Sequence, residues 1–213
     1  MTQPHDRRPI ASRNTGWARR LSIWLASTPI TPNQISLASI AAALVAGGAF
    51  WAVGSADGGG RVALLVLAAL GCQVRLICNL MDGLVAIEAG RQAPDGPFWN
   101  EFPDRIADIA ILAGLGLGLG LPALGWAAAA LAVLTAYTRE LGRSCGLAAD
   151  FSGPMAKPQR MALVTAGALI AVLEPLWSAG NTVLWITLWL VMLGTALTVA
   201  RRAWRIVSAL NAG

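Results

Sequence analysis

Histidine is almost missing from this sequence, and charged residues are scarce. The single histidine, His5, lies in a polar N-terminal segment, so a histidine-based catalytic triad or a histidine-ligated metal is excluded. The three cysteines, Cys72, Cys78 and Cys145, are too few and too scattered for a disulfide framework or a zinc site. Charged residues make up only 13% of the chain, against about 25% in ordinary soluble domains. This composition excludes a disordered protein and disfavours a soluble enzyme.

Hydrophobic residues make up 56% of the 213 residues. They gather in six apolar runs close to the roughly 20 residues that a membrane-spanning helix needs, at 35–53, 62–79, 106–121, 123–137, 161–177 and 182–200. We therefore predict an all-α integral membrane protein, one domain over 1–213 with six transmembrane helices. Their expected bounds are about 33–54, 61–87, 100–121, 123–143, 158–178 and 182–204.

The segment before the first span predicts a helix that lies in the membrane interface. Its large apolar residues recur at helical spacing, with arginines elsewhere on the wheel, so we expect an amphipathic interfacial helix over 12–28. Thr31-Pro32-Asn33-Gln34 then predicts a helix start, with Thr31 as N-cap and Gln34 completing a capping box. A ligand contact by Asn33 and Gln34 is the alternative.

A stretch of alternating Gly and Leu, 114–121, resembles a strand, but an isolated strand in lipid would leave its backbone unpaired. We therefore predict a helix. Its glycines form two GxxxG spacings, Gly114/Gly118 and Gly116/Gly120, which suit close helix contact. Tight packing inside one bundle and a homodimer face are both open.

The cationic residues indicate the orientation in the membrane. Fourteen of the sixteen Lys and Arg residues fall in the two ends of the chain and in the second-to-third and fourth-to-fifth links, while Arg61 alone lies opposite. The positive-inside rule then predicts that both termini and both of these links are cytoplasmic, in a multi-pass protein of the cytoplasmic (inner) membrane. The net charge of +5 fits anionic lipid better than nucleic acid, so no nucleic acid partner is expected.

Polar residues cluster where the second predicted span ends and the third begins. Asn79 and Asp82 are three residues apart, and Asn100, Asp104 and Asp108 follow at intervals of four, so each set shares one helix face. Two antiparallel neighbours would aim these oxygens at one point near the membrane surface, and such oxygens suit Mg²⁺ or Mn²⁺. A solvated loop with ordinary helix caps is the alternative, but it leaves the deeper carboxylates unexplained.

This cluster resembles the signature of the CDP-alcohol phosphotransferase family. The family pattern is D-x2-D-G-x2-A-R-x8-G-x3-D-x3-D, and the chain matches every spacing with Asn79-Leu-Met-Asp82-Gly83-Leu-Val-Ala86 and Gly96-Pro-Phe-Trp-Asn100-Glu-Phe-Pro-Asp104. The resemblance also covers the Thr31-Pro-Asn-Gln opening, Arg139 and Glu140 at the end of the fourth span, and Lys157 and Arg160 opening the fifth. It thus extends over nearly the whole chain.

The resemblance implies transfer of a phosphatidyl or other substituted phosphate group from a CDP-alcohol, CDP-diacylglycerol above all, to an alcohol acceptor, with release of CMP. It assigns Asn79, Asp82, Asn100 and Asp104 to one or two Mg²⁺ or Mn²⁺ ions, and Asp104 also to proton abstraction from the acceptor. The implied CDP-binding residues are Gly83, Ala86, Arg91 and Gly96, and the implied acceptor-phosphate residues are Arg139, Arg143, Lys157 and Arg160. Simple attraction of the last four to anionic headgroups is the alternative.

The departures from the family pattern lower the negative charge of the site. Asn79 and Asn100 stand where the family has aspartate, and Ile87 stands where it has arginine. Asparagine still ligates a cation through its carbonyl oxygen, but affinity should fall. Glu88 and Glu101 are candidates to restore the charge, and Arg91 to replace the arginine. A non-catalytic relative that acts as a membrane scaffold is the main alternative function.

Two further charges, Arg75 and Asp108, lie one turn deeper than the motif on the same helix faces. An isolated charge at that depth is costly, whereas an Arg–carboxylate pair satisfies both partners. We therefore predict a salt bridge that forms the floor of the site. The alternative places Asp108 at the metal and Arg75 at the substrate phosphate. A transporter is less favoured, because spans four to six carry almost no polar residues in their cores.

Overall fold

The chain folds into seven α-helices and one short 3-10 turn in the computed structural model, which describes residues 15–91, 93–177 and 180–212. Every regular element in these residues is helical, which confirms the all-α prediction. The helices are α1 (Gly16–Ala26), α2 (Pro32–Val53), α3 (Gly58–Glu88), α4 (Gly96–Gly118), α5 (Pro122–Ser144), α6 (Lys157–Leu173) and α7 (Thr182–Ala212), with η3 (Glu174–Leu176) after α6.

Four of the described helices are long and apolar enough to cross a membrane: α2, α3, α6 with its η3 extension, and α7. The remaining long helices, α4 and α5, have 23 residues each, about 35 Å at a rise of about 1.5 Å per residue, but they do not meet the same criterion. Six helices therefore occupy the six predicted segments, and six membrane crossings stay a prediction.

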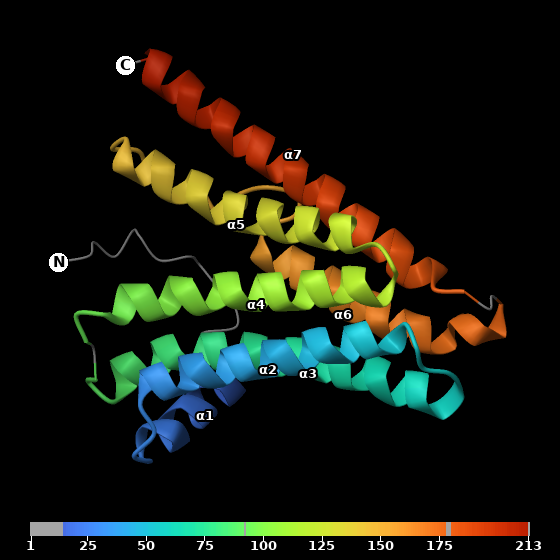
Figure 1. Cartoon of the computed structure of the whole chain (residues 1–213). Coiled ribbons are helices and arrows are strands. Elements are labelled where there is room, and N and C mark those ends of the chain that lie inside the picture. The colour runs from blue at the N-terminus through green and yellow to red at the C-terminus, as the bar shows by residue number, and fades with distance from the viewer. Residues whose placement is uncertain (1–14, 92, 178–179, 213) are drawn as a thin grey trace.

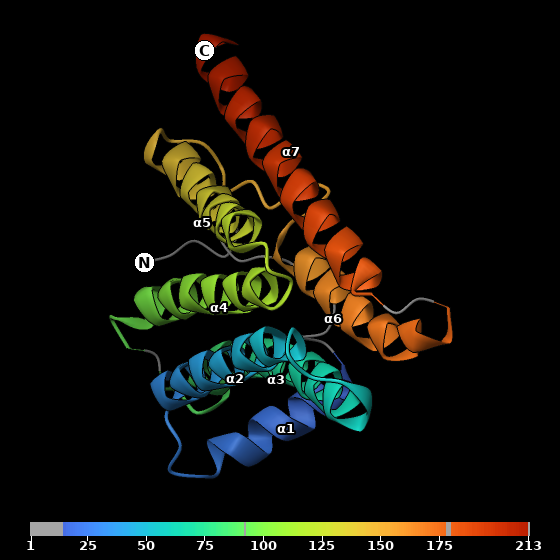
Figure 2. The ribbon, with the colours of Figure 1, turned by 45° about the vertical axis from the view of Figure 1, so that its right-hand side comes forward.

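The helices run roughly along one direction, and the bundle has two distinct ends (Figure 1). Three short connections, α2–α3, α4–α5 and α6–α7, lie at one end, on the right of Figure 1. The opposite end holds the start of α2 and α4 together with the ends of α3, α5 and α7. Helix α2 packs against α3 and α4, and α6 lies between α3 and α7. Figure 2 shows α7 leaning away from α4, with α1 beneath α2 and α3.

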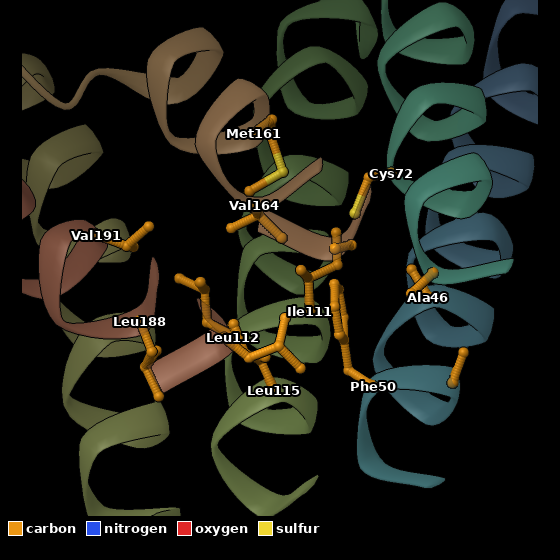
Figure 3. Packing of buried hydrophobic residues seen from close by; sticks show 14 of the residues in the cluster. Ala46, Phe50, Cys72, Ile111, Leu112, Leu115, Met161, Val164, Leu188 and Val191 are labelled. Carbon is orange, nitrogen blue, oxygen red and sulfur yellow. The ribbon is translucent and has the colours of Figure 1, made fainter. Parts of the chain in front are cut away.

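The core is a layer of aliphatic side chains between α2, α4, α6 and α7 (Figure 3). Phe50 from α2 meets Ile111 and Leu115 from α4, and Met161 and Leu188 complete the layer from α6 and α7. Large apolar residues also cover the outside of the helices, as at Leu44, Trp51, Leu67, Trp126 and Leu193. Helices that are apolar all round are typical of membrane spans.

Glycines allow α4 to approach its two neighbours closely. A Cβ atom on Gly114 would lie 2.2 Å from the carbonyl oxygen of Gly47 on α2, and one on Gly116 would lie 2.5 Å from the Cα of Gly125 on α5. The first predicted GxxxG spacing therefore serves packing inside the bundle. The second predicted spacing, Gly116/Gly120, does not lie on one helix face. Helix α4 ends at Gly118, and Gly120 adopts a φ of 68° in the turn that follows. A homodimer stays a prediction.

The N-terminal part of the predicted organisation is also recognisable. Helix α1 lies within the expected 12–28 segment, of which residues 12–14 lie outside the described residues. Its tryptophans, Trp17 and Trp24, are exposed. The capping box at the start of α2 is confirmed: Gln34 N donates to Thr31 Oγ1 at 3.2 Å, and Thr31 N donates to Gln34 Oε1 at 2.9 Å.

Candidate active site at the ends of α3 and α4

Three helices bring buried charges together at the end of the bundle opposite the short connections. Asp82 comes from the last turns of α3, Asp104 and Asp108 come from the first half of α4, and Lys157 opens α6. The three aspartates are 4%, 5% and 0% exposed. Because buried carboxylates need compensating donors, the contacts of each one define the site.

Asp82 is held by neutral donors only. Ser36 Oγ on α2 donates to Asp82 Oδ2 at 2.8 Å, and the Gly83 amide donates to Asp82 Oδ1 at 2.6 Å. Each carboxylate oxygen can accept more than one bond, so Asp82 keeps capacity for a cation. Ser36 was missed by sequence reasoning, because a serine one turn after a capping box gives no functional signal.

Asp104 is surrounded by cationic side chains. Lys157 Nζ forms a close ion pair with Asp104 Oδ2, and Arg75 Nη2 lies 3.2 Å from Asp104 Oδ1. Arg105 Nη2 lies 3.6 Å from Oδ2, and Asn79 Nδ2 donates to Oδ1 at 3.1 Å. The motif residues of α3 and α4 therefore do converge, but Asp104 meets three cationic side chains that the signature does not contain: Arg75, Arg105 and Lys157.

The predicted contact between Arg75 and Asp108 is present below the site. Arg75 Nη2 lies 3.1 Å from Asp108 Oδ1, and the same nitrogen contacts Asp104. Arg160 was expected at an acceptor phosphate, yet it is 1% exposed and its Nη2 lies 2.6 Å from Asp108 Oδ2. Asp108 thus bridges two arginines. Sequence reasoning placed Arg160 by its position at the helix start and missed its direction toward α4.

Buried donors remain without a partner in this floor. Nε and Nη1 of Arg75 and Nε of Arg160 have no hydrogen-bond acceptor among the described residues. Buried polar groups without a partner are rare in folded proteins, and a bound ligand or water usually pairs with them. The floor therefore has spare capacity to bind an anion or water.

The other predicted acceptor-phosphate arginines lie at an outer rim. Arg139 Nη2 lies 2.6 Å from Glu101 Oε2, and Arg139 Nε lies 2.8 Å from Glu140 Oε1. Arg143 Nη1 lies 3.1 Å from Glu140 Oε2. Glu101, proposed to restore charge at the metal, thus pairs with Arg139 instead.

The remaining predicted residues surround the mouth of the site. Asn100 and Glu88 are exposed, and among the described residues neither forms a hydrogen bond or ion pair with Asp82 or Asp104. A Cβ atom on Gly83 or Gly96 would meet nothing within 4 Å. Neither glycine is therefore needed for helix packing, which keeps the face of α3 open to a substrate.

Arg91 connects two links rather than pointing to Asp82. Its Nη1 donates to the carbonyl oxygens of Thr28 at 3.1 Å and Ile30 at 3.0 Å. Asn33 Nδ2, in the first turn of α2, donates to Oδ2 of Asp95, the residue before α4, at 3.2 Å. These bonds hold the start of α2 beside the start of α4, so Asn33 and Arg91 shape the mouth in this structure.

Comparison with known proteins gives relatives that match most of the chain. No family model matches the sequence. The chain is 28% identical over 190 residues to the inner membrane protein YnbA of Escherichia coli strain K12, covering 86% of this chain and 89% of that protein. It is 27% identical over 185 residues to the phosphatidylinositol phosphate synthase of Mycobacteroides abscessus, covering 81% and 75%.

The fold is shared with solved structures of a phosphatidylinositol phosphate synthase. The Mycobacterium tuberculosis phosphatidylinositol phosphate synthase PgsA1, crystallised with manganese and citrate, superposes with a TM-score of 0.72 at 18% identity, over 89% of this chain and 88% of that chain. The same protein with CDP-DAG bound gives a TM-score of 0.71. The likeness to these structures shows a shared fold. Together with the signature spacing, the relatives indicate the CDP-alcohol phosphotransferase family.

The donor atoms of the chain fit one hard divalent cation better than two. Asp82 keeps free lone pairs, and the donation by Asn79 Nδ2 leaves the Asn79 carbonyl oxygen as the atom that can ligate. Asp104 is already contacted by Lys157 and Arg75. No group of three or more His, Cys, Asp or Glu side chains suited to a metal occurs in the part of the chain that the structure describes.

A cavity of about 180 Å³ lies between α5 and α7. Arg139, Arg202 and Arg205 line it together with Asp150. Arg202 is buried and donates Nη1 to the Thr135 carbonyl oxygen at 2.6 Å. Sequence reasoning counted Arg202 and Arg205 only for membrane orientation, because the fold alone brings the end of α7 to Arg139.

The 145–156 link beside this cavity is stabilised by Asp150. Ser152 N donates to Asp150 Oδ1 at 2.8 Å, and Arg205 Nη1 lies 3.1 Å from Asp150 Oδ2. Partial burial raises the pKa of Asp150, but the hydrogen bonds from Ser152 and the charge of Arg205 outweigh it, so its pKa lies below the usual value. The carboxylate therefore stays ionised near neutral pH.

Proposed function

We propose that this chain transfers a phosphatidyl or other substituted phosphate group from a CDP-alcohol, with CDP-diacylglycerol as the favoured donor, to an alcohol acceptor in phospholipid biosynthesis. The observation that carries the proposal is the convergence of Asp82 and Asp104, at the family spacing, from neighbouring helices at one end of an apolar bundle. Buried carboxylates at membrane depth are costly and mark function.

The reaction is a phosphoryl transfer, in which positioning and charge neutralisation supply most of the catalysis. The acceptor oxygen bonds to the phosphorus that carries the lipid alcohol, the bond from that phosphorus to the bridging oxygen breaks, and CMP leaves with that oxygen. The proton of the acceptor hydroxyl passes to a carboxylate oxygen of Asp104. Asn79, Asp82 and Asn100 would hold a divalent Mg²⁺ or Mn²⁺ ion, which would supply charge neutralisation of the diphosphate.

The neighbouring residues position the two substrates. The bare face of α3 at Gly83 lets the nucleotide approach the helix, since nothing occupies the space of a Cβ there. Arg75 and Arg160 hold the floor, and three of their nitrogens have no protein acceptor in the described residues, which leaves them free to bind substrate. The arginines of the α5–α7 cavity favour an acceptor that itself carries a phosphate.

The site lies on the cytoplasmic side in this proposal, and all six long helices span the membrane as one domain. The short connections gather at the end that carries Arg61, whereas the motif end carries most of the arginines. The positive-inside rule then places both termini and the site in the cytoplasm. Helix α1 lies in the interface, with its exposed tryptophans in the lipid headgroups.

The test is an assay of the purified chain with CDP-diacylglycerol, Mn²⁺ and a panel of alcohols, some with and some without a phosphate. We expect release of CMP that depends on the acceptor. The alternative, a non-catalytic scaffold of this family, predicts no CMP with any acceptor. Equilibrium dialysis with Mn²⁺ and CDP separates the two further, since a scaffold binds neither.

A further inference from the structure

The sequence contains a single lysine, and this residue lies in the candidate active site. Of the sixteen Lys and Arg residues, fifteen are arginine and the only lysine is Lys157. Its side chain is 17% exposed and forms the close ion pair with Asp104. A lysine ammonium is a compact point charge, whereas the guanidinium of arginine is a planar fork. Of the two, lysine is therefore the closer substitute for a bound metal cation.

The site carries no net negative charge before any ion is bound. Its buried acids are Asp82, Asp104 and Asp108, and its cationic side chains are Arg75, Arg105, Lys157 and Arg160. The diphosphate of a CDP-alcohol adds two negative charges, which one divalent cation neutralises. A second divalent cation would add two further positive charges among largely buried cationic side chains, which is costly.

The asparagines of the motif point the same way. Asn79 and Asn100 stand where the family pattern has carboxylates, so the site has two fewer negative charges to balance a second cation. Asn79 does not compensate for this at Asp104, because its Nδ2 turns a donor toward that carboxylate. Three features therefore oppose a cation at Asp104: the missing carboxylates, the donor of Asn79 and the ammonium of Lys157.

We propose that Lys157 takes the place of a second divalent cation beside Asp104, so that this chain binds a single divalent ion, at Asp82. The inference rests on the proposed function, whose substrate supplies the diphosphate. It assigns Lys157 a role different from acceptor-phosphate binding. It also explains how a motif with two aspartates in place of four can serve the same chemistry.

The test is the number of Mn²⁺ ions bound per chain in the presence of CDP, measured on the full chain in detergent from the electron paramagnetic resonance signal of free Mn²⁺. We expect one ion for the wild type. Lys157→Met combined with Asn79→Asp and Asn100→Asp should bind two. Arg201→Met, which removes the same charge from an exposed position on α7, should bind one, as should the charge-conserving Lys157→Arg.

Two ions in the wild type overturn the inference, whether or not any variant folds. One ion in a triple variant that keeps the wild-type helix content and elution volume also overturns it. No bound ion in the wild type overturns it as well, and the CMP assay then separates the two proposals. CMP release without bound Mn²⁺ leaves the transferase standing, whereas no binding and no CMP release removes both.

Discussion

Two clusters of buried charge lie at opposite ends of the bundle, and they differ in how fully their polar atoms are paired. At the end with the short connections, Arg61 donates to Glu174 at 3.1 Å, to Asn181 at 3.0 Å and to the Ala171 carbonyl at 2.9 Å. Glu174 is fully buried and also accepts from the Val183 amide. In the described residues neither side chain has a buried polar atom without a partner.

The cluster at the motif end is larger and incompletely paired. Its floor, formed by Arg75, Asp108 and Arg160, leaves three arginine nitrogens without an acceptor in the described part of the chain. A buried group without a partner costs free energy, and a structural clamp gains nothing from leaving it so. The comparison indicates that the Arg61 cluster clamps α3 to α6 and α7, while the unpaired nitrogens of the motif cluster are available to bind a ligand.

The largest expected effect comes from removing either motif carboxylate. Asp104→Asn should lower the rate of CMP release by about 10²–10⁴-fold, the usual contribution of a positioned base. Asp82→Asn should also abolish most activity, because it removes the one carboxylate that keeps free capacity for a cation. The measurement is CMP release per folded chain, with Asp57→Asn at the other end as the matched control. Wild-type rates for both variants would show that the site is elsewhere.

The second prediction compares the two clusters by double-mutant cycles. Asp108→Leu leaves Arg160 without a carboxylate and Arg75 with Asp104 alone, and it should cost about 3–5 kcal/mol of stability. Adding Arg75→Met should recover only part of this, because Arg160 is still unpaired. In the Arg61 cluster, Arg61→Met with Glu174→Leu should recover most of the loss, since one pair is removed whole. Thermal unfolding in detergent measures both cycles, and purely additive losses would argue against coupling in either cluster.

The activity of the same variants sharpens the comparison. Arg61→Met and Glu174→Leu should leave the turnover of the folded fraction unchanged, because both side chains lie far along the bundle from Asp82. Arg75→Met should lower it, since Arg75 contacts Asp104 directly. A proportional loss of turnover in the Arg61 variants would mean that the two ends of the bundle are not separate in function.

The asparagines of the motif give a smaller effect. Asn79→Asp combined with Asn100→Asp should tighten Mn²⁺ binding on the order of tenfold, because affinity rises with the number of charged ligands. Mn²⁺ titration in the absence of substrate measures this. Equal or weaker binding by the double variant would exclude direct ligation by these two positions.

The smallest effect concerns the pH dependence of the 145–156 link, which Asp150 stabilises. Because the pKa of Asp150 is lower in the folded chain than in the unfolded one, its contribution to stability is complete above the unfolded value of about 3.9 and is lost as the pH falls through the lower folded value. Hydrogen exchange in the 150–156 link should therefore rise in acid for the wild type. In Asp150→Asn the exchange should already be raised at neutral pH and lack this acid step.

The fold and the site were predictable to different extents. Apolar periodicity located every long helix, and the capping box at Thr31 and Gln34 was visible in four residues, because such local rules act within one turn. The Arg75–Asp108 contact followed from spacing on two antiparallel helices. Arg160 and Lys157 could not be placed this way, since the rotation of α6 about its axis depends on packing against α3 and α7. The same holds for the meeting of Arg202 with Thr135.

The most direct test of the account is CMP release by the purified chain from CDP-diacylglycerol with Mn²⁺ and the acceptor panel. The account predicts acceptor-dependent CMP formation in the wild type, its loss in Asp82→Asn and Asp104→Asn, and its retention per folded chain in Arg61→Met. Failure of the wild type to release CMP with every acceptor, in a preparation that keeps its helices and binds Mn²⁺, would contradict it.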